Sequence, residues 1–281
     1  MKTDYGKTLE RAEAIVRDAG EILREYHDKP DQVEWKGADD PVTAADKAVN
    51  RFLVAAIGEA FPDDAILSEE SRDDLVRLKY ARVWCIDPLD GTKEFMARNG
   101  EFSIMVGLAV EGRAMLGVVY QPIVDILYSG IRHEGSRVFS GGKSRTLLVS
   151  QKNEPVDLRL VVSRSHRNPI TDRIKTALGI AHERISGSVG IKCGLIAEGE
   201  ADLYLHPAPG TKEWDTCAPE AILAGAGGRM TDCWGRPLVY NASDVRRRYG
   251  LVASNGSCHS MVVDRMVPAL AEEGISPDAG W

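Results

Sequence analysis

Two aspartates lie three residues apart at the end of one apolar run. Residues 83–86 form a short β-favouring stretch, and Asp87 and Asp90 follow it on a bend that Pro88 and Gly91 tighten. Both side chains can therefore face one small volume. Two such charges about 4 Å apart repel by roughly 4 kcal/mol at an effective dielectric of about 20, so a positive group is expected between them.

Other carboxylates indicate what that positive group is. Asp and Gly are common turn formers, so the first stretch alone is only moderately specific. However, Glu69 follows the apolar run 65–67, and Asp215 opens a later helix. Carboxylates at several element ends are hard to explain as turns. Hard oxygen ligands without an accompanying histidine or thiolate suit Mg²⁺, with Mn²⁺ as a substitute, rather than zinc or copper.

These motifs resemble those of the inositol monophosphatase family, a group of magnesium-dependent, lithium-sensitive phosphatases, over nearly the whole chain. The matching motifs stand in the family's order: Glu69-Glu70, Asp87-Pro88-Leu89-Asp90-Gly91-Thr92, and Trp214-Asp215 before a helix rich in small residues. Within the family, the chain is most similar to the 3'(2'),5'-bisphosphate nucleotidases, which remove the 3'-phosphate from 3'-phosphoadenosine 5'-phosphate. That closer match lies in residues 93–95, 98–102, 163–166 and 209–220.

The resemblance implies a set of metal ligands. Glu69, Asp87 and the backbone carbonyl of Leu89 hold one ion, while Asp87, Asp90 and Asp215 hold a second. The family therefore implies two or three Mg²⁺ ions in one site, with Asp87 as the bridging ligand. Such ions clamp a phosphoryl group and activate a water molecule for in-line attack on phosphorus.

The resemblance also implies catalytic roles. Thr92 is expected to orient the nucleophilic water, and Glu69 or Asp46 to complete the proton relay. Asp46 also completes a capping box with Thr43 at the start of a helix, and the two roles are compatible. The backbone N–H groups of Gly91 and Thr92, at another helix start, are expected to bind phosphate oxygens. The structural alternative for Thr92 is a helix cap.

Substrate contacts are expected from two later segments. Ser165 and His166 match residues that contact the nucleotide in the bisphosphate nucleotidases, and Gly187, Ser188 and Lys192 lie where the family approaches ribose and the 5'-phosphate. A helix that begins at Ser188 offers N–H donors to a second phosphate. Each residue also has a plain structural alternative, as an N-cap, a solvated lysine or a loop histidine.

One departure from the family pattern bears on the substrate. Inositol monophosphatases carry a glutamate shortly before their Trp-Asp pair, whereas residues 206–212 contain no acid. The leading hypothesis is therefore a hydrolase acting on 3'-phosphoadenosine 5'-phosphate, an activity linked to sulfur metabolism. An inositol, histidinol or sugar monophosphatase with the same metal site is the second hypothesis. A Mg²⁺- or nucleotide-binding regulator without turnover is the third.

Composition limits the other partners. The 281 residues carry a formal charge of -7, which argues against binding a nucleic-acid polymer. No apolar run approaches the roughly 18 residues of a membrane helix, and the first residues lack the apolar core of a secretory signal, so a cytoplasmic location is expected. Five cysteines without a Cys-x-x-Cys pair indicate reduced, buried thiols. By resemblance the chain is a monomer or a homodimer.

The elements that position these residues form two unlike halves. Residues 1–150 are expected to form an α+β half and residues 151–281 an α/β half. In the first half we expect helices 8–26 and 43–61, an exposed charged segment 71–82, and antiparallel strands 102–110, 113–120, 125–131, 136–139 and 146–149. In the second half we expect strands 158–162, 201–205, 228–231 and 251–253, with helices 169–178, 188–198, 215–226 and 257–272. The resemblance implies an α-β-α-β-α sandwich of the inositol monophosphatase and fructose-1,6-bisphosphatase type, with the site between the halves.

Overall fold

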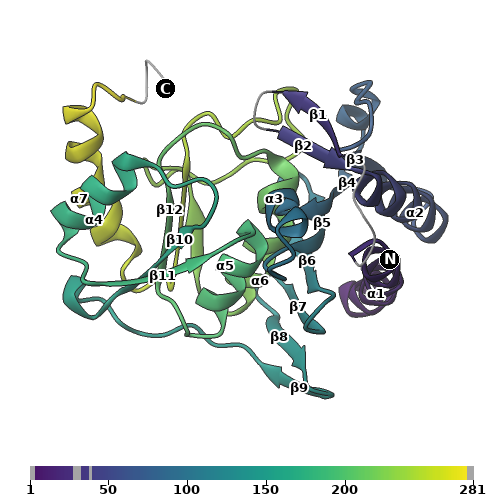
Figure 1. Ribbon diagram of the computed structural model, residues 1–281, viewed down its shortest axis with the longest axis horizontal. Helices are drawn as coiled ribbons and strands as arrows, with labels where there is room; N and C mark the ends of the chain where they lie inside the picture. The colour runs from purple at the N-terminus through teal and green to yellow at the C-terminus, as the bar shows by residue number, and fades with distance from the viewer. Residues whose placement is uncertain (1–3, 28–32, 38–39, 277–281) are drawn as a thin grey trace.

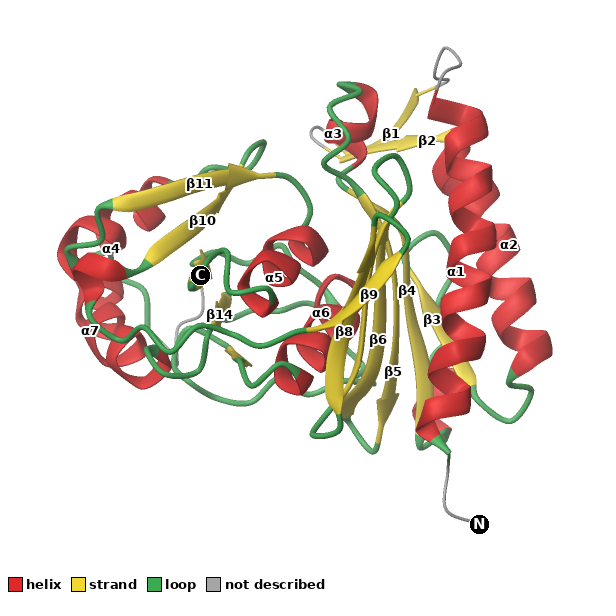
Figure 2. Ribbon diagram, turned by 90° about the horizontal axis from the view of Figure 1, so that it is seen from below, coloured by secondary structure: helices red, strands yellow, loops and turns green. Residues whose placement is uncertain are grey.

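Two β-sheets, separated and flanked by helices, make up the protein. The computed structural model describes residues 4–27, 33–37 and 40–276. In Figures 1 and 2, one pair of helices covers the outer face of the larger sheet, a second pair lies between the two sheets, and a third pair covers the smaller sheet. This arrangement confirms the expected α-β-α-β-α sandwich.

The first two layers come from the earlier part of the chain. The helices are α1 (Tyr5–His27) and α2 (Ala44–Ala60), and a two-stranded ribbon of β1 (Val33–Gly37) and β2 (Asp40–Thr43) lies between them in sequence. The seven-stranded sheet has its strands in sequence order, and only its first pair is parallel. Its strands are β3 (Ala65–Ser68), β4 (Arg82–Asp90), β5 (Ser103–Val110), β6 (Arg113–Gln121), β7 (Ile126–Ile131), β8 (Gly135–Ser140) and β9 (Lys143–Thr146).

The other three layers come from the later part of the chain. The smaller sheet has the strand order β11-β10-β12-β14-β13. Its strands are β10 (Arg159–Ser163), β11 (His182–Ser186), β12 (Leu203–His206), β13 (Arg229–Thr231) and β14 (Leu251–Ser254). The helices are α4 (Pro169–Leu178), α5 (Val189–Ala197), α6 (Glu213–Gly225) and α7 (His259–Glu272), while the short α3 (Thr92–Met96) and the 3₁₀ turns Val76–Lys79 and Pro155–Asp157 lie in connections.

Apolar spacing explains the outer helices. In α1, residues such as Leu9, Ile15 and Leu23 recur on one face and are buried against the larger sheet. Helix α2 begins with the predicted capping box, in which the Thr43 side chain accepts from the Asp46 N–H and Asp46 accepts from the Thr43 N–H at 2.7 Å. Helix α2 therefore holds a fixed position beside β4, the strand that carries the paired aspartates, while α1 packs on α2 and on β5, β6 and β7.

Helix α6 lies directly on the backbone of the larger sheet. Gly107, Gly117 and Gly130 stand on neighbouring strands β5, β6 and β7. A Cβ atom on Gly117 would lie 2.3 Å from the backbone oxygen of Ala218, and one on Gly107 would lie 2.5 Å from the Ala218 nitrogen. Because these positions lack side chains, the helix approaches closely, and its first turn comes to the end of β4.

Pro88 does not end its strand, contrary to prediction. Strand β4 continues through Pro88 to Asp90, and its pairing with β5 shifts register between Asp87, opposite Met105, and Asp90, opposite Ser103. A proline, which has no N–H to donate, is tolerated in a sheet at such an irregularity. The irregularity separates the two aspartates along the strand while keeping both at its carboxyl end.

Three other expectations need correction. The expected strand 146–149 is instead Lys143–Thr146, because Gly141 and Gly142, both at positive φ, make the turn earlier. Strand β11 was missed, since this edge strand is largely polar and exposed and gives no apolar signal. The segment 71–82 is only partly exposed, because Arg77 is buried and bonds to Asp73.

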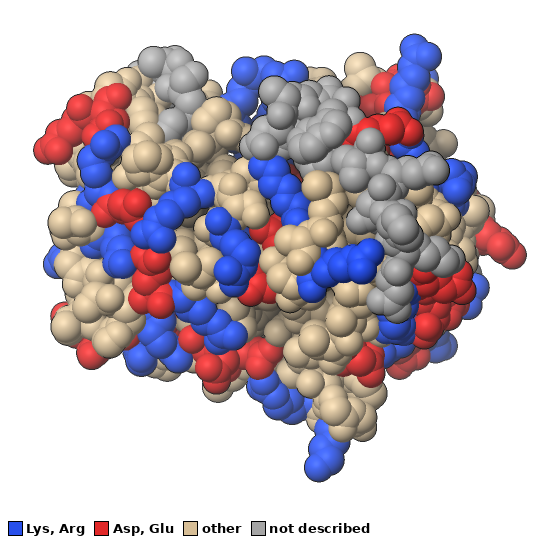
Figure 3. Space-filling model, in the orientation of Figure 1, with Lys and Arg blue, Asp and Glu red and all other residues tan. Residues whose placement is uncertain are grey.

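The expectation of reduced, buried thiols is confirmed. All five cysteines are free and buried. None of the helices in the described ranges is long and apolar enough to cross a membrane. On the face shown in Figure 3, basic and acidic side chains are interspersed. The division into domains 1–150 and 151–281 stays a prediction: the two sheets respect it, but α6 packs on the earlier sheet.

Candidate active site

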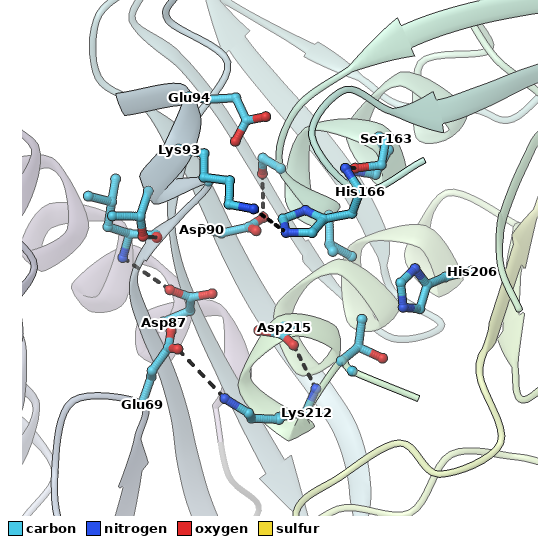
Figure 4. Close-up of a pocket in the computed structure, with 18 of the residues that line it drawn as sticks. Glu69, Asp87, Asp90, Lys93, Glu94, Ser163, His166, His206, Lys212 and Asp215 are labelled. Atoms are coloured by element: carbon cyan, nitrogen blue, oxygen red, sulfur yellow. Dashed lines mark hydrogen bonds and ion pairs between the residues drawn. The ribbon is translucent and has the colours of Figure 1, made fainter. Parts of the chain in front are cut away.

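A cavity of about 360 Å³ lies where the carboxyl end of β4 meets the start of α6 (Figure 4). Four carboxylates, which we call the acidic wall, lie on one side of it. They are Glu69, Asp87, Asp90 and Asp215. The rest of the lining, which we call the far wall, carries nitrogen-bearing and hydroxyl side chains from other segments, beside the carboxylate of Glu94. We define it as Lys93, Ser163, His166, Ser188, Lys192, His206 and Thr211.

Three elements bring the acidic wall together. Glu69 follows β3 and is held to β4 by a hydrogen bond from its N–H to the Ile86 carbonyl at 3.1 Å. Asp87 and Asp90 stand at the irregular end of β4. Asp215 lies in the first turn of α6, where it accepts a hydrogen bond from the Lys212 N–H at 2.6 Å. The structure thus brings the four predicted carboxylates to one cavity.

The electrostatics of the acidic wall oppose full ionisation. Burial raises the pKa of Asp87, and the charges of Glu69, Asp90 and Asp215 raise it further. Burial, then Glu69 and Asp90, raises the pKa of Asp215 to about 8. These carboxylates therefore carry more negative charge than the surrounding protein compensates.

Two lysines supply part of the compensation. The Lys212 ammonium lies 3.9 Å from a Glu69 carboxylate oxygen. Lys192 is buried beside Asp90; burial lowers the pKa of this lysine, while the Asp90 charge opposes that change. The alternative of a solvated surface lysine is therefore wrong for Lys192.

The donor chemistry of the acidic wall fits a hard divalent cation, because it is made of carboxylate oxygens alone. No group of three Asp, Glu, His or Cys side chains within the described residues is already arranged to hold an ion. The carboxylates are turned toward protein donors instead. Asp90 accepts hydrogen bonds from the Ser188 hydroxyl and from the Gly190 N–H at 3.0 Å, and Asp87 accepts from the Leu89 N–H at 3.0 Å.

Thr92 lies beside these carboxylates, at the start of α3. Its hydroxyl is 3.4 Å from Asp46 Oδ1 and 3.3 Å from the Leu89 carbonyl oxygen. Asp46 is buried and lies behind the cavity, and burial raises its pKa to about 6. Gly91, with φ of 99°, makes the tight turn that leads into α3. The hydroxyl and the carboxylate are thus brought within reach of one another.

The remaining predicted substrate residues divide into two groups. Ser188 and His166 line the cavity; the Ser188 side chain also caps α5, and His166 Nε2 lies 3.3 Å from the Lys93 ammonium. Ser165 and Gly187 do not line it. The Ser165 hydroxyl donates to Glu94, and the Gly187 N–H donates to Glu101 at 2.7 Å.

Several cavity residues were missed by sequence reasoning. They are Lys93, Glu94, Ser163, Tyr204, His206, Thr211 and Lys212. Nε2 of His206 and Oγ1 of Thr211 are buried and have no hydrogen-bond partner in the described part of the chain. Leaving a buried polar group unpaired costs about 1–3 kcal/mol. The available signal for Thr211 and Lys212 was their place in the segment 209–220, which carries the closer family match.

Comparisons with known proteins agree with this geometry. Residues 4–267 match the model of the Inositol monophosphatase family. The 3'(2'),5'-bisphosphate nucleotidase CysQ of Escherichia coli (strain K12) is 36% identical over 235 residues, which cover 83% of this chain and 93% of the relative.

Solved structures give the same result. The crystal structure of CysQ from Bacteroides thetaiotaomicron has a TM-score of 0.76 at 32% identity and covers 89% of this chain and 97% of its own. The IMPase of Thermotoga maritima has a TM-score of 0.78 at 27% identity, covering 95% and 99%. Sequence, fold and carboxylate arrangement therefore agree that the chain belongs to the inositol monophosphatase family of metal-dependent phosphatases.

Proposed function

We propose that this chain hydrolyses the 3'-phosphate of 3'-phosphoadenosine 5'-phosphate, giving AMP and phosphate. Relatives at 36% identity that carry the name 3'(2'),5'-bisphosphate nucleotidase support this choice within the family. The observation that carries the proposal is the pairing of an acidic wall with a buried lysine in one cavity. One end suits a phosphoryl group held with metal ions, and the other suits a second anionic group.

The acidic wall would take the phosphoryl group that is removed. Enzymes of this family use Mg²⁺ in general. Here Glu69, Asp87, Asp90 and Asp215, with the Leu89 carbonyl, would hold such ions. When bound, they supply positive charge to the phosphoryl oxygens and lower the pKa of a water. Binding requires the carboxylates to be ionised, and it would offset the repulsion that raises their pKa values.

The chain's own groups would position the attacking water. The Thr92 hydroxyl can accept a hydrogen bond from water while it donates one to Asp46, and the distances of 3.3–3.4 Å from Thr92 allow this exchange of partners. Gly91 and Thr92 form the start of α3 and line the cavity, so their N–H groups would bind phosphate oxygens. Glu69 belongs to the acidic wall and would provide a second acceptor for a proton of the water.

The far wall would take the second phosphate. Lys192 is already close to Asp90, and Lys93 lies beside His166. A bisphosphate offers a second dianionic group that these ammonium groups can bind. A substrate with a single phosphate has no second anionic group for these ammonium groups to bind, which favours a bisphosphate over an inositol or sugar monophosphate.

The test is phosphate release measured in parallel from 3'-phosphoadenosine 5'-phosphate and inositol 1-phosphate, with Mg²⁺, with and without lithium. We expect a preference for the nucleotide of at least 100-fold in kcat/KM, lost in Asp90→Asn. Preference for the inositol ester would overturn the nucleotide assignment and keep the family chemistry. Absence of turnover on both, together with Mg²⁺-dependent nucleotide binding, would favour the regulator instead.

A further inference from the structure

Hydrogen bonds join the connection between β3 and β4 to the connection between β13 and β14. Arg77 is at their centre and is buried. Its guanidinium donates to the Asp73 carboxylate at 2.7 Å, to the side-chain oxygen of Asn241 at 2.9 Å and to the Ala242 carbonyl at 2.9 Å. The Asn241 amide in turn donates to the Arg77 carbonyl at 3.2 Å. The two connections therefore bond to each other in both directions.

The second of these connections is also bonded to the first residue of α6. The Glu213 carboxylate accepts hydrogen bonds from the Asn241 N–H at 2.7 Å and from the Ala242 N–H at 2.9 Å. Burial raises the pKa of Glu213, while these hydrogen bonds and the charges of Arg247 and Arg77 oppose the rise. Arg77, Asn241 and Glu213 thus form a continuous chain of contacts, which we call the Arg77 network.

The Arg77 network links the two segments that bring Glu69 and Asp215 to the cavity. Glu69 lies at the start of the connection that contains Arg77, and Asp215 lies two residues after Glu213 in the first turn of α6. The residues of the network do not line the cavity themselves. On the cavity side, the Lys212 ammonium lies 3.9 Å from a Glu69 carboxylate oxygen. The two segments are therefore held together at the cavity and also away from it.

Stability alone is a weak explanation for this network. Arg77 and Glu213 both leave water on folding, and buried ionic networks are often no more stabilising than apolar side chains of similar volume. Their hydrogen bonds are directional, however, because a planar guanidinium fixes the positions of its acceptors. A magnesium site needs such precision, since the small ion requires near-ideal octahedral geometry from its oxygen ligands.

We propose that Arg77 and Asn241 are positioning residues for the metal site. By bonding the connection after Glu69 to the first turn of α6, they hold Glu69 and Asp215 at the spacing that the proposed metal ions require. This inference rests on the metal site of the proposed function, but not on the choice of substrate. Loss of the network should weaken metal binding although all the carboxylate ligands are still present.

The test measures Mn²⁺ binding without substrate, from the electron paramagnetic resonance signal of the free ion. Arg77→Met removes the guanidinium. Asn241→Gly removes the side-chain contacts and suits the backbone, because Asn241 has a φ of 58°. We expect the Kd for Mn²⁺ to rise about 10-fold in either variant, as for other residues that hold metal ligands in place. In the double variant the Kd should rise by less than the product of the two single effects, because both variants break the same link.

Arg82→Met is the matched control. It removes an arginine that is paired with Asp64 at 2.6 Å, at the opposite end of β4 from the paired aspartates. Urea unfolding should show lower stability in this control and in both network variants, since each substitution leaves a polar partner unpaired. Only the network variants should lose affinity for Mn²⁺.

The outcomes separate this inference from the proposed function. Unchanged Mn²⁺ affinity in Asn241→Gly, or an equal loss in Arg82→Met, overturns the inference and leaves the proposed metal site intact. Wild-type protein that binds no Mn²⁺, or that binds it equally well after Asp90→Asn, overturns the proposed metal site and this inference with it.

Discussion

The two walls of the cavity differ in how the chain builds them. The acidic wall takes two carboxylates from a single stretch of β4 and one from each of two neighbouring elements, all at element ends. The far wall is assembled from α3, the loop after β10, α5 and the segment after β12. A chemical function that many substrates share can be carried by short, fixed motifs. Under the proposed function, recognition of one substrate is spread over several separate segments of the chain.

The largest expected effect tests the acidic wall. Asp90→Asn removes a charge that the proposed metal ions would need, while it can still accept hydrogen bonds from Ser188 and Gly190. We expect kcat to fall by at least about 1,000-fold on every phosphate ester, because the loss concerns the reacting group itself. Steady-state phosphate release measures it, with the exposed Asp63→Asn as control. A loss of activity confined to the nucleotide substrate would contradict the assignment of the reacting phosphoryl group to the acidic wall.

Lys192→Met makes the complementary test on the far wall. Its charge faces Asp90 and would face a second phosphate, so the loss should be larger for a bisphosphate than for 3'-AMP. We expect KM for 3'-phosphoadenosine 5'-phosphate to rise about 10- to 100-fold, and the ratio between the two substrates to fall with it. The exposed Lys152→Met is the control. Equal losses on both substrates would assign Lys192 to the support of Asp90 alone.

The far wall should also respond to pH in its own way. The folded protein holds the pKa of His206 near 4, below the value of about 6.5 in the unfolded chain. The unfolded state therefore binds more protons between these values, so the stabilisation is present above pH 6.5 and is lost as pH falls toward 4. Between pH 7.5 and 5 we expect a loss of about 2 kcal/mol from this residue. Urea unfolding of wild type and His206→Gln measures it, and identical pH slopes in the two proteins would contradict it.

The smallest effect concerns the stability of the acidic wall without metal. Burial, and then the like charges of its neighbours, raise the pKa of Asp87 and oppose folding at neutral pH. In the presence of a chelator, Asp87→Asn should increase the free energy of unfolding by about 1 kcal/mol at pH 7.5, although it abolishes activity. Added Mg²⁺ should stabilise the wild-type protein and leave the variant unchanged. A destabilised variant would mean that the ionised Asp87 carboxylate is stabilised by its surroundings more than the neighbouring like charges repel it.

The contrast between the walls also explains what the sequence could predict. The layered fold, the capping box of Thr43 and Asp46, and the four carboxylates followed from local patterns and from the family motifs. The lack of a hydrogen-bond partner at His206 and Thr211 could not be predicted, because it depends on the folded surroundings of the two side chains. Strand β11 was missed because an exposed edge strand has no apolar face to show.

The roles of individual residues stay predictions of unequal weight. The burial of Lys192 beside Asp90 supports its predicted role, and the contact of Thr92 with Asp46 supports the role predicted for Thr92. The predicted nucleotide contacts of Ser165 and Gly187 are less well supported, because their hydrogen-bonding groups already donate to Glu94 and Glu101. A motif match indicates that a residue lies near the site, whereas the contacts in the folded protein decide which of its atoms is available to bind a substrate.

The glycines beneath α6 have a consequence for how this chain can change. Helix α6 rests on Gly107, Gly117 and Gly130. The position of Asp215 relative to Asp87 therefore depends on three glycines that lie in a different part of the sequence. Substitution of one of them by alanine would leave all ligands and their motifs intact and still displace a carboxylate. Inactive descendants of this protein could therefore keep a complete set of active-site motifs. The cause of their inactivity would be a single substitution in a strand of the larger sheet.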